Sequence, residues 1–265
     1  MNKRRDSVCY DPPFVRQRRD EAYVLGTNQL GEADLIVTLL AENLGRVRGV
    51  AAFARKSRKR FGGTLDPMTR VRATWVEREG RELHRIESLE LVRSFAAMQS
   101  DPALQAACAV LCEITASLVR EEQPDPHTFR LIGAVLEALE RGVHPWLAVR
   151  YAEYWLLQLH GVLPDAAHCA GCGAPIGSGE TAAAGAGGLF CGRCPKPPGA
   201  VPLAARDREA LAAFAKRPPG ALDIDLDAVR PGGALEALLR GTLQNFVERI
   251  FKTYRHLRAA TAAGR

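Results

Sequence analysis

Apolar and polar positions divide the chain into a strand-like first third and a helical remainder. Residues 70–77 read R-V-R-A-T-W-V-E and alternate in the way typical of a half-buried strand. Short apolar runs bounded by turn residues predict further strands at 22–27, 34–40, 46–53 and 83–89. Five short strands, joined mostly by hairpins, indicate a small closed or partly open barrel.

Beyond about residue 95 the apolar positions recur with helical spacing. The start of the first helix has a clear signal, because the side chain of Asp101 can cap free N–H groups and Pro102 suits the first helical position. Proline and glycine mark the later ends. The pattern predicts helices at 102–121, 127–141, 145–160, 204–216 and 233–258.

Four cysteines interrupt this helical region in two C-x-x-C pairs. Cys169 and Cys172 form the first pair, and Cys191 and Cys194 form the second after 18 intervening residues. Each pair can reach one ion from a tight turn, and the two turns together complete a tetrahedron around Zn²⁺. With four thiolates bound, the ion has no open position for water, so the site is expected to be structural.

Other interpretations of the cysteines are weaker. Disulfides need an oxidising compartment, and the first residues, M-N-K-R-R-D-S, are not followed by an apolar signal segment. A thioredoxin-like redox motif normally has one C-x-x-C, not two. His168 could in principle replace a cysteine ligand, but it is more simply an exposed neighbour. We therefore expect a reducing, cytoplasmic location.

The charge of the chain is unevenly distributed. The net charge is +6, and all of the excess lies in residues 1–96, which hold 19 Lys and Arg against 13 Asp and Glu. Such asymmetry points to a polyanionic partner. Its densest part follows the third predicted strand and comprises Arg55, Lys56, Arg58, Lys59 and Arg60.

This basic segment, residues 55–60, is a candidate phosphate-binding site. Cations that meet phosphates release condensed counterions, which gives affinity independent of sequence. A solvated surface loop is the alternative interpretation, but a small barrel of the kind that binds single strands favours DNA. Phe61 and Trp75 are candidate stacking platforms for bases, although the position of Trp75 in an alternating strand fits the barrel core better.

The sequence contains no recognisable reaction centre and no run of 18 apolar residues. The phosphate-binding G-x-x-x-x-G-K-[ST], the metalloprotease H-E-x-x-H and the hydrolase G-x-S-x-G patterns are all missing. The six histidines are scattered. The sequence therefore predicts a binding protein that is neither an enzyme nor inserted in a membrane.

Several segments, in this order along the chain, resemble the RecO family. They are Tyr23–Leu25 with Glu32–Asp34, Gly45-Arg46, the A-R-K-S-R-K-R-F-G-G segment, L-D-P-M-T, L-H-R-I, L-L-Q-L-H-G-V-L-P-D and the four cysteines. The match spans about residues 20–200. The order of the segments is more specific than any one of them.

The resemblance implies a fold and a function. The expected fold is α+β: an N-terminal five-stranded OB-fold barrel followed by an all-α helical domain with an inserted four-cysteine zinc ribbon. The expected ranges are a flexible basic lead-in at 1–19, the barrel at 20–96, the helical domain at 97–164 and 200–258, the ribbon at 165–199 and a disordered tail at 259–265.

The function that the resemblance implies is mediation of DNA repair and recombination in the RecF pathway. It implies binding of single- and double-stranded DNA through Arg55, Lys56, Arg58, Lys59 and Arg60, and annealing of complementary strands. It also implies partnership with RecR and with single-stranded-DNA-binding protein, so that RecA is loaded at gaps. The alternatives are a protein scaffold that does not bind DNA and a nucleic-acid enzyme, for which clustered carboxylates are missing.

Overall fold

The first domain is a closed five-stranded barrel with the strand order β1-β2-β3-β5-β4. The computed structural model describes residues 15–56, 61–78, 82–95, 98, 100–177 and 180–263. The pairings are antiparallel except for β3 with β5, as in a Greek-key barrel of the OB type. The predicted barrel is confirmed. Its strands are β1 (Val15–Leu30), β2 (Asp34–Ala41), β3 (Gly45–Ala51), β4 (Arg70–Arg78) and β5 (His84–Arg93).

Strand β1 begins earlier than the sequence predicted. Residues 15–19, expected to belong to a flexible lead-in, pair with β4 in a continuous antiparallel ladder. The segment lacks apolar alternation, so its register is supported by charges: Arg18 lies 3.0 Å from Glu77, and Arg19 lies 2.9 Å from Glu90. The prediction was wrong for these five residues, and residues 1–14 lie outside the described part.

The barrel encloses its own apolar core. Trp75 is fully buried in it, as its place in an alternating strand predicted. Phe61, just after the basic segment, is buried in the same core. The core is completed by small and branched side chains from every strand, including Val37, Leu39, Val47, Val71 and Ile86.

The second domain is helical, and its first three helices begin at aspartate-proline or histidine-proline pairs. Asp101 accepts hydrogen bonds from the backbone N–H of Ala103 at 2.7 Å and of Leu104 at 3.2 Å, which confirms the predicted cap. The helices are α3 (Pro102–Leu118), α4 (Pro126–Glu140), α5 (Pro145–Leu159), α6 (Ala205–Lys216), α7 (Gly241–Phe246) and α8 (Tyr254–Ala263). Short 3₁₀ turns at Pro219–Ala221 and Leu226–Ala228 and a π-helical stretch, η3 (Glu236–Arg240), connect them.

The C-terminal segment differs from the single helix predicted at 233–258. The chain leaves the helix after α7, passes Glu248 with a positive φ of 52°, and starts again at Tyr254. The carboxylate of Glu113 on α3 holds this break by accepting hydrogen bonds from the N–H groups of Lys252 and Thr253, at 3.1 and 2.9 Å. Helix α8 then continues to Ala263, so the tail predicted at 259–265 is helical as far as residue 263.

A buried ionic cluster connects α5 to the C-terminal elements. Arg150 is fully buried and lies 2.7 Å from Glu153 and 2.9 Å from Glu236. Tyr254 donates a hydrogen bond to Glu153, and Arg258 pairs with Glu236. Because a buried charge without a partner is strongly destabilising, these residues require one another in the folded domain.

The barrel and the helical domain fit together at the turn before β3. The backbone N–H of Arg46 donates to the carbonyl of Arg120 at 3.0 Å, and the guanidinium of Arg46 donates to the carbonyl of Ala116. At Gly45, whose φ is +70°, an added Cβ would lie 1.9 Å from the carbonyl oxygen of Gln123. The junction therefore requires glycine at this position, for its backbone conformation and for its lack of a side chain.

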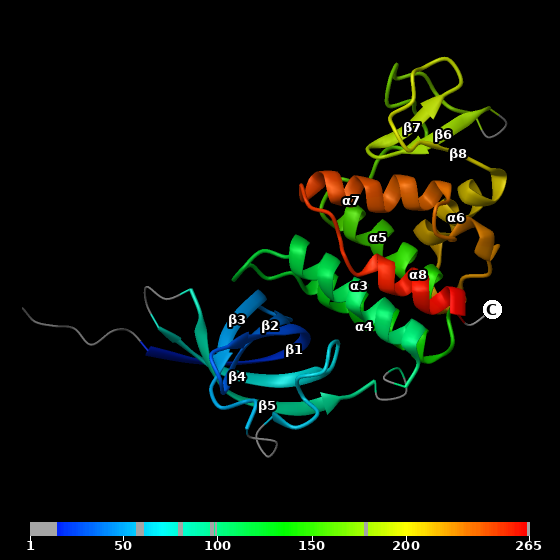
Figure 1. Cartoon of the computed structure of the whole chain (residues 1–265). Coiled ribbons are helices and arrows are strands. Elements are labelled where there is room, and N and C mark those ends of the chain that lie inside the picture. The colour runs from blue at the N-terminus through cyan, green and yellow to red at the C-terminus, as the bar shows by residue number, and fades with distance from the viewer. Residues whose placement is uncertain are drawn as a thin grey trace, which may run out of the picture.

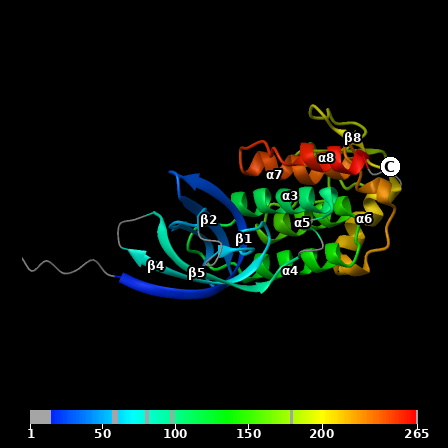
Figure 2. The ribbon, with the colours of Figure 1, turned by 60° about the horizontal axis from the view of Figure 1, so that its bottom comes forward.

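The four-cysteine ribbon lies at the opposite end of the helical domain from the barrel (Figures 1 and 2). Its sheet has the order β7-β6-β8 and comprises β6 (Ala182–Gly185), β7 (Gly188–Cys191) and β8 (Val201–Pro202). Its hairpin turn packs on the helices, since the N–H of Gly187 donates to the hydroxyl of Thr242 at 2.9 Å. None of the helices in the described ranges has the length and apolar character that crossing a membrane requires.

Candidate metal centre and nucleic-acid interface

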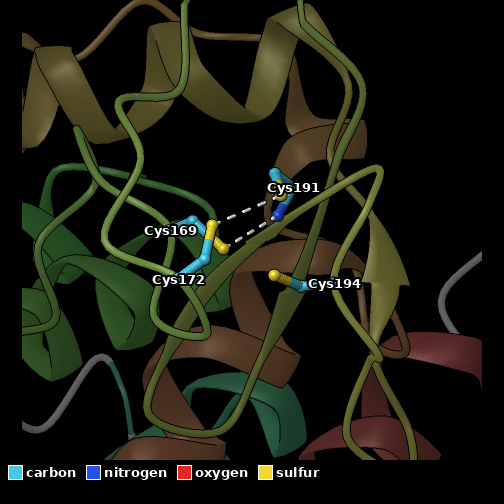
Figure 3. Close-up of side chains that lie close together, drawn as sticks. All are labelled: Cys169, Cys172, Cys191 and Cys194. Carbon is cyan, nitrogen blue, oxygen red and sulfur yellow. Dashed lines mark hydrogen bonds between the residues drawn. The ribbon is translucent and has the colours of Figure 1, made fainter.

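The two C-x-x-C pairs converge at one end of the ribbon. Cys169 and Cys172 lie in the turn before β6, Cys191 ends β7, and Cys194 lies in the turn that follows. Their side chains point toward one another (Figure 3), and all four Sγ atoms lie within 4.8 Å of one another. The grouping predicted from the spacing is therefore present in the structure.

Local backbone geometry brings these turns close enough. The N–H of Gly173 donates to the carbonyl of Cys169 at 2.8 Å, which closes the first turn, and Gly173 has a φ of +70° that favours glycine. At Gly171 an added Cβ would lie 3.2 Å from the Sγ of Cys194. A glycine here leaves room for the sulfur of the opposite turn.

The electrostatics of the cluster favour a bound cation. Backbone hydrogen bonds, foremost from the N–H of Cys191 at 3.3 Å, lower the pKa of the Cys169 thiol to about 6. Hydrogen bonding with the side chains of Cys172, Cys169 and Cys191 raises the pKa of Cys194 to about 12. Four thiolates cannot share this space without an opposing charge, and a divalent metal supplies that charge.

The sulfur positions also fit tetrahedral coordination. Metal–sulfur bonds of about 2.3 Å place the sulfurs of a tetrahedron about 3.8 Å apart. The Sγ atoms of Cys172 and Cys191 are separated by 3.9 Å. His168 is not part of the cluster, because its Nδ1 pairs with the carboxylate of Asp165 at 2.6 Å. The four cysteines can thus hold one metal ion without a fifth ligand.

The second candidate site begins just after β3, where the basic segment leaves the barrel. Arg55 and Lys56 are exposed there. The N–H of Arg55 donates to the carbonyl of Ala33 at 3.1 Å, and its guanidinium donates to the carbonyl of Glu32 at 2.9 Å. These contacts fix the start of the segment on the turn between β1 and β2. The other predicted phosphate ligands, Arg58, Lys59 and Arg60, lie outside the described residues.

The start of this segment differs from most of the barrel wall in the pairing of its charges. On the wall, Glu21 lies 2.7 Å from Arg70 and 3.3 Å from Arg72, and Arg18 and Arg19 have the carboxylate partners named above. Within the described part of the chain, neither Arg55 nor Lys56 forms an ion pair. Arg55 and Lys56 therefore carry positive charge that is free to meet an external anion. Within the described residues, Arg16 on β1 and Arg85 on β5 are likewise exposed and form no ion pair.

The aromatic residues proposed as stacking platforms do not serve that role. Phe61 is 2% exposed and Trp75 is 0% exposed, so neither ring can meet a base without unfolding the barrel. The interpretation of Trp75 as core is correct, and the proposal for Phe61 is wrong. The closed barrel needs large side chains at its centre, and these rings supply them.

Comparison with known proteins gives two adjoining family matches. The model for "Recombination protein O N terminal" matches residues 15–95, and that for "Recombination protein O C terminal" matches residues 99–255. The chain belongs to the RecO family. The boundary between the two matches coincides with the passage from the barrel to the helical domain.

Individual relatives agree with this assignment. A protein named DNA repair protein RecO in Anaeromyxobacter sp. (strain K) is 40% identical over 190 residues, covering 71% of this chain and 75% of the relative. The protein of the same name in Myxococcus xanthus is 32% identical over 237 residues, covering 86% and 90%. The one in Koribacter versatilis is 39% identical over 156 residues, covering 59% and 64%.

One residue that sequence reasoning placed inside a strand has a different position in this RecO-family chain. Strand β3 ends at Ala51, two residues before Phe53. Phe53 is 62% exposed and lies two residues before the first cation of the basic segment. The sequence does contain a signal for this position, a large aromatic residue close to a run of cations. The predicted strand at 46–53 includes Phe53, and so the prediction misses its exposure.

Proposed function

We propose that this RecO-family chain is a non-enzymatic mediator of DNA repair and recombination. In this proposal the barrel binds single- and double-stranded DNA through the basic segment, and neutralising phosphates on two strands at once promotes their annealing. The observation that carries it is that Arg55 and Lys56 are adjacent, exposed and without a carboxylate partner in the described part of the chain, whereas most arginines of the barrel wall are paired. Cations without an internal carboxylate partner can release counterions from DNA.

The partners in this proposal follow from membership of the family. With RecR, the protein acts on DNA coated by single-stranded-DNA-binding protein and helps to load RecA, in the cytoplasm. The relatives are named as DNA repair proteins, which supports this role. RecA filament formation on coated gapped DNA, with RecR and with or without this protein, tests the role directly. Equal rates in the two reactions contradict it.

Zinc is the metal that we propose for the four cysteines, with a structural role. Four thiolates without an oxygen ligand suit Zn²⁺, and a fully coordinated ion has no position for a reacting water. The metal thus stabilises the ribbon and takes part in no reaction.

The DNA-binding proposal is tested by the salt dependence of binding. We expect Arg55→Ala with Lys56→Ala to weaken binding to single strands and to duplexes. If both cations contact phosphate, the slope of log K against log salt falls by about 1.8 for duplex and about 1.4 for single strands.

A matched control is available at the other end of the molecule. Lys216 and Arg217 are exposed at the end of α6, and Figure 1 shows that α6 lies far from the barrel. Lys216→Ala with Arg217→Ala removes the same charge, so we expect it to leave the slope unchanged. Equal effects of the two double variants would show that Arg55 and Lys56 are not the phosphate contacts. No DNA binding by the wild type at low salt would favour the protein scaffold that does not bind DNA.

A further inference from the structure

Phe53 is an exposed aromatic residue held in an unusual backbone conformation. Its φ is +58°, in the left-handed region that bulky side chains rarely occupy. The carboxylate of Asp34 accepts the N–H of Phe53 at 2.8 Å, and the carbonyl of Phe53 accepts the N–H of Lys56 at 3.0 Å. A strained residue persists when its surroundings hold it, and such residues cluster at binding sites.

The ring of Phe53 lies outside the barrel core, and two cations follow it closely in the sequence. Tyr23, Phe61, Trp75 and Phe95 are between 0 and 5% exposed, whereas Phe53 is 62% exposed. Among the described aromatic residues of the barrel domain, the ring available to a ligand is therefore that of Phe53. The next described cations, Arg55 and Lys56, follow within three residues.

We propose that Phe53 is a base-stacking platform that makes the site favour single-stranded over double-stranded nucleic acid. This inference depends on the proposed function, because it assigns a further residue to the same interface. The bases of a single strand expose their faces to an aromatic ring, whereas those of a duplex are covered by their neighbours. The adjacent cations attract the phosphates of either form, and the ring distinguishes between the two.

The contribution of one stacked base defines the expected effect. Aromatic stacking on a base corresponds to about 5- to 150-fold in affinity. We therefore expect Phe53→Ala to weaken binding of a thymidine oligonucleotide by a factor in this range and to leave duplex binding within about twofold. The salt dependence is unchanged, because no charge is removed.

An oligonucleotide of abasic residues separates stacking from all phosphate contacts. It retains the backbone charge but has no bases, so wild type and Phe53→Ala should bind it equally. Phe53→Trp should bind the thymidine strand at least as tightly as wild type. Lys56→Ala is the control for charge and should weaken binding of the thymidine strand, the duplex and the abasic strand alike.

A variant that relieves the backbone strain at Phe53 tests whether a loss of single-strand affinity is caused by misfolding. Glycine adopts a φ of +58° readily, so Phe53→Gly should keep the wild-type melting temperature or raise it by about 2–4 °C. It should nevertheless lose single-strand affinity as Phe53→Ala does. A drop in stability together with equal losses on all ligands would assign Phe53 a structural role and overturn the proposal.

A substitution at Asp34 gives a second test. Its loss of negative charge and its loss of the contact to Phe53 change single-strand affinity in opposite directions. Asp34→Ala removes a negative charge near the site, which by itself tightens binding to every nucleic acid. It also releases the N–H of Phe53, which should lower the ratio of single-strand to duplex affinity. A ratio equal to that of wild type would contradict a positioning role for Asp34.

The outcomes distinguish this inference from the proposed function. If wild type binds DNA through the basic segment but Phe53→Ala binds thymidine strands normally, stacking is wrong and the mediator proposal stands. If wild type binds no nucleic acid, both are wrong. If Phe53→Ala instead abolishes association between copies of the protein, measured by analytical ultracentrifugation, the ring belongs to a protein interface.

Discussion

The barrel and the four-cysteine ribbon, at opposite ends of the molecule, are stabilised by different means. The barrel closes its backbone hydrogen bonds around large apolar side chains such as Trp75, Leu39 and Ile86. In the ribbon, β6 has the sequence Ala-Ala-Ala-Gly and provides little apolar surface of its own. Ala182, Ala184 and Leu189 pack into the core of the helical domain, and the four sulfurs converge on one site. The barrel is stabilised without the help of its unpaired surface cations, so these are available to a ligand. The four thiolates of the ribbon, in contrast, need a bound metal ion.

The largest expected effect is loss of the metal from the ribbon. Structural zinc contributes on the order of 10–16 kcal/mol of binding free energy in small finger peptides. Cys191→Ser with Cys194→Ser should abolish metal binding and raise hydrogen exchange at residues 165–202, and the barrel should remain protected. Elemental analysis and hydrogen exchange mass spectrometry measure both. Cys108→Ala, at a buried cysteine outside the cluster, should keep the metal; wild-type protein that contains none would end the zinc proposal.

The complementary change destabilises the barrel and spares the ribbon. Trp75 is fully buried, so Trp75→Ala should cost about 3–5 kcal/mol of unfolding free energy. Urea unfolding measures this cost, and metal content should stay at the wild-type value. Trp75→Phe, which keeps an aromatic ring in the cavity, should cost less. Loss of metal in the Trp75→Ala variant would show that the two ends are energetically coupled.

Gly45 tests how the barrel is attached to the helical domain. Gly45→Ala meets both an unfavourable positive φ and the carbonyl of Gln123, so it should cost more than about 1–3 kcal/mol, the usual effect of strain alone. Gly142→Ala is the matched control, because Gly142 also has a positive φ but an added Cβ would contact nothing within 4 Å. Thermal unfolding of the pair gives the cost of the clash as their difference. Equal destabilisation would show that the junction adjusts.

The smallest expected effect concerns pH and the break before α8. Burial alone would raise the pKa of Glu113, but hydrogen bonds from Thr253 and Lys252 outweigh it and hold the pKa below its ordinary value. A carboxyl group with a lowered pKa stabilises the fold at pH values above its unfolded pKa, near 4.5, and loses that contribution as the pH falls through the folded value. Glu113→Gln should cost about 1–2 kcal/mol at pH 7 and less below pH 4. A cost independent of pH, measured by urea unfolding, would contradict this.

Features set by local chemistry were predictable from the sequence. The cap at Asp101 and the convergence of four cysteines depend on short-range spacing, and both appear as expected. Features set by distant partners were not. Residues 15–19 become a strand because β4 lies beside them, and the break before Tyr254 depends on Glu113, about 140 positions earlier. The sequence predicts Phe53 as the end of a strand, because apolar alternation cannot show where strand pairing stops.

The buried cluster around Arg150 has a consequence for synthesis on the ribosome. The barrel is complete once residue 95 has emerged, so it can fold while the rest is translated. Arg150 must wait for Glu236, 86 positions later, and Glu153 must wait for Tyr254, 101 positions later. A product truncated before these residues leaves Arg150 and Glu153 without two of their buried partners, so its helical body cannot complete its fold.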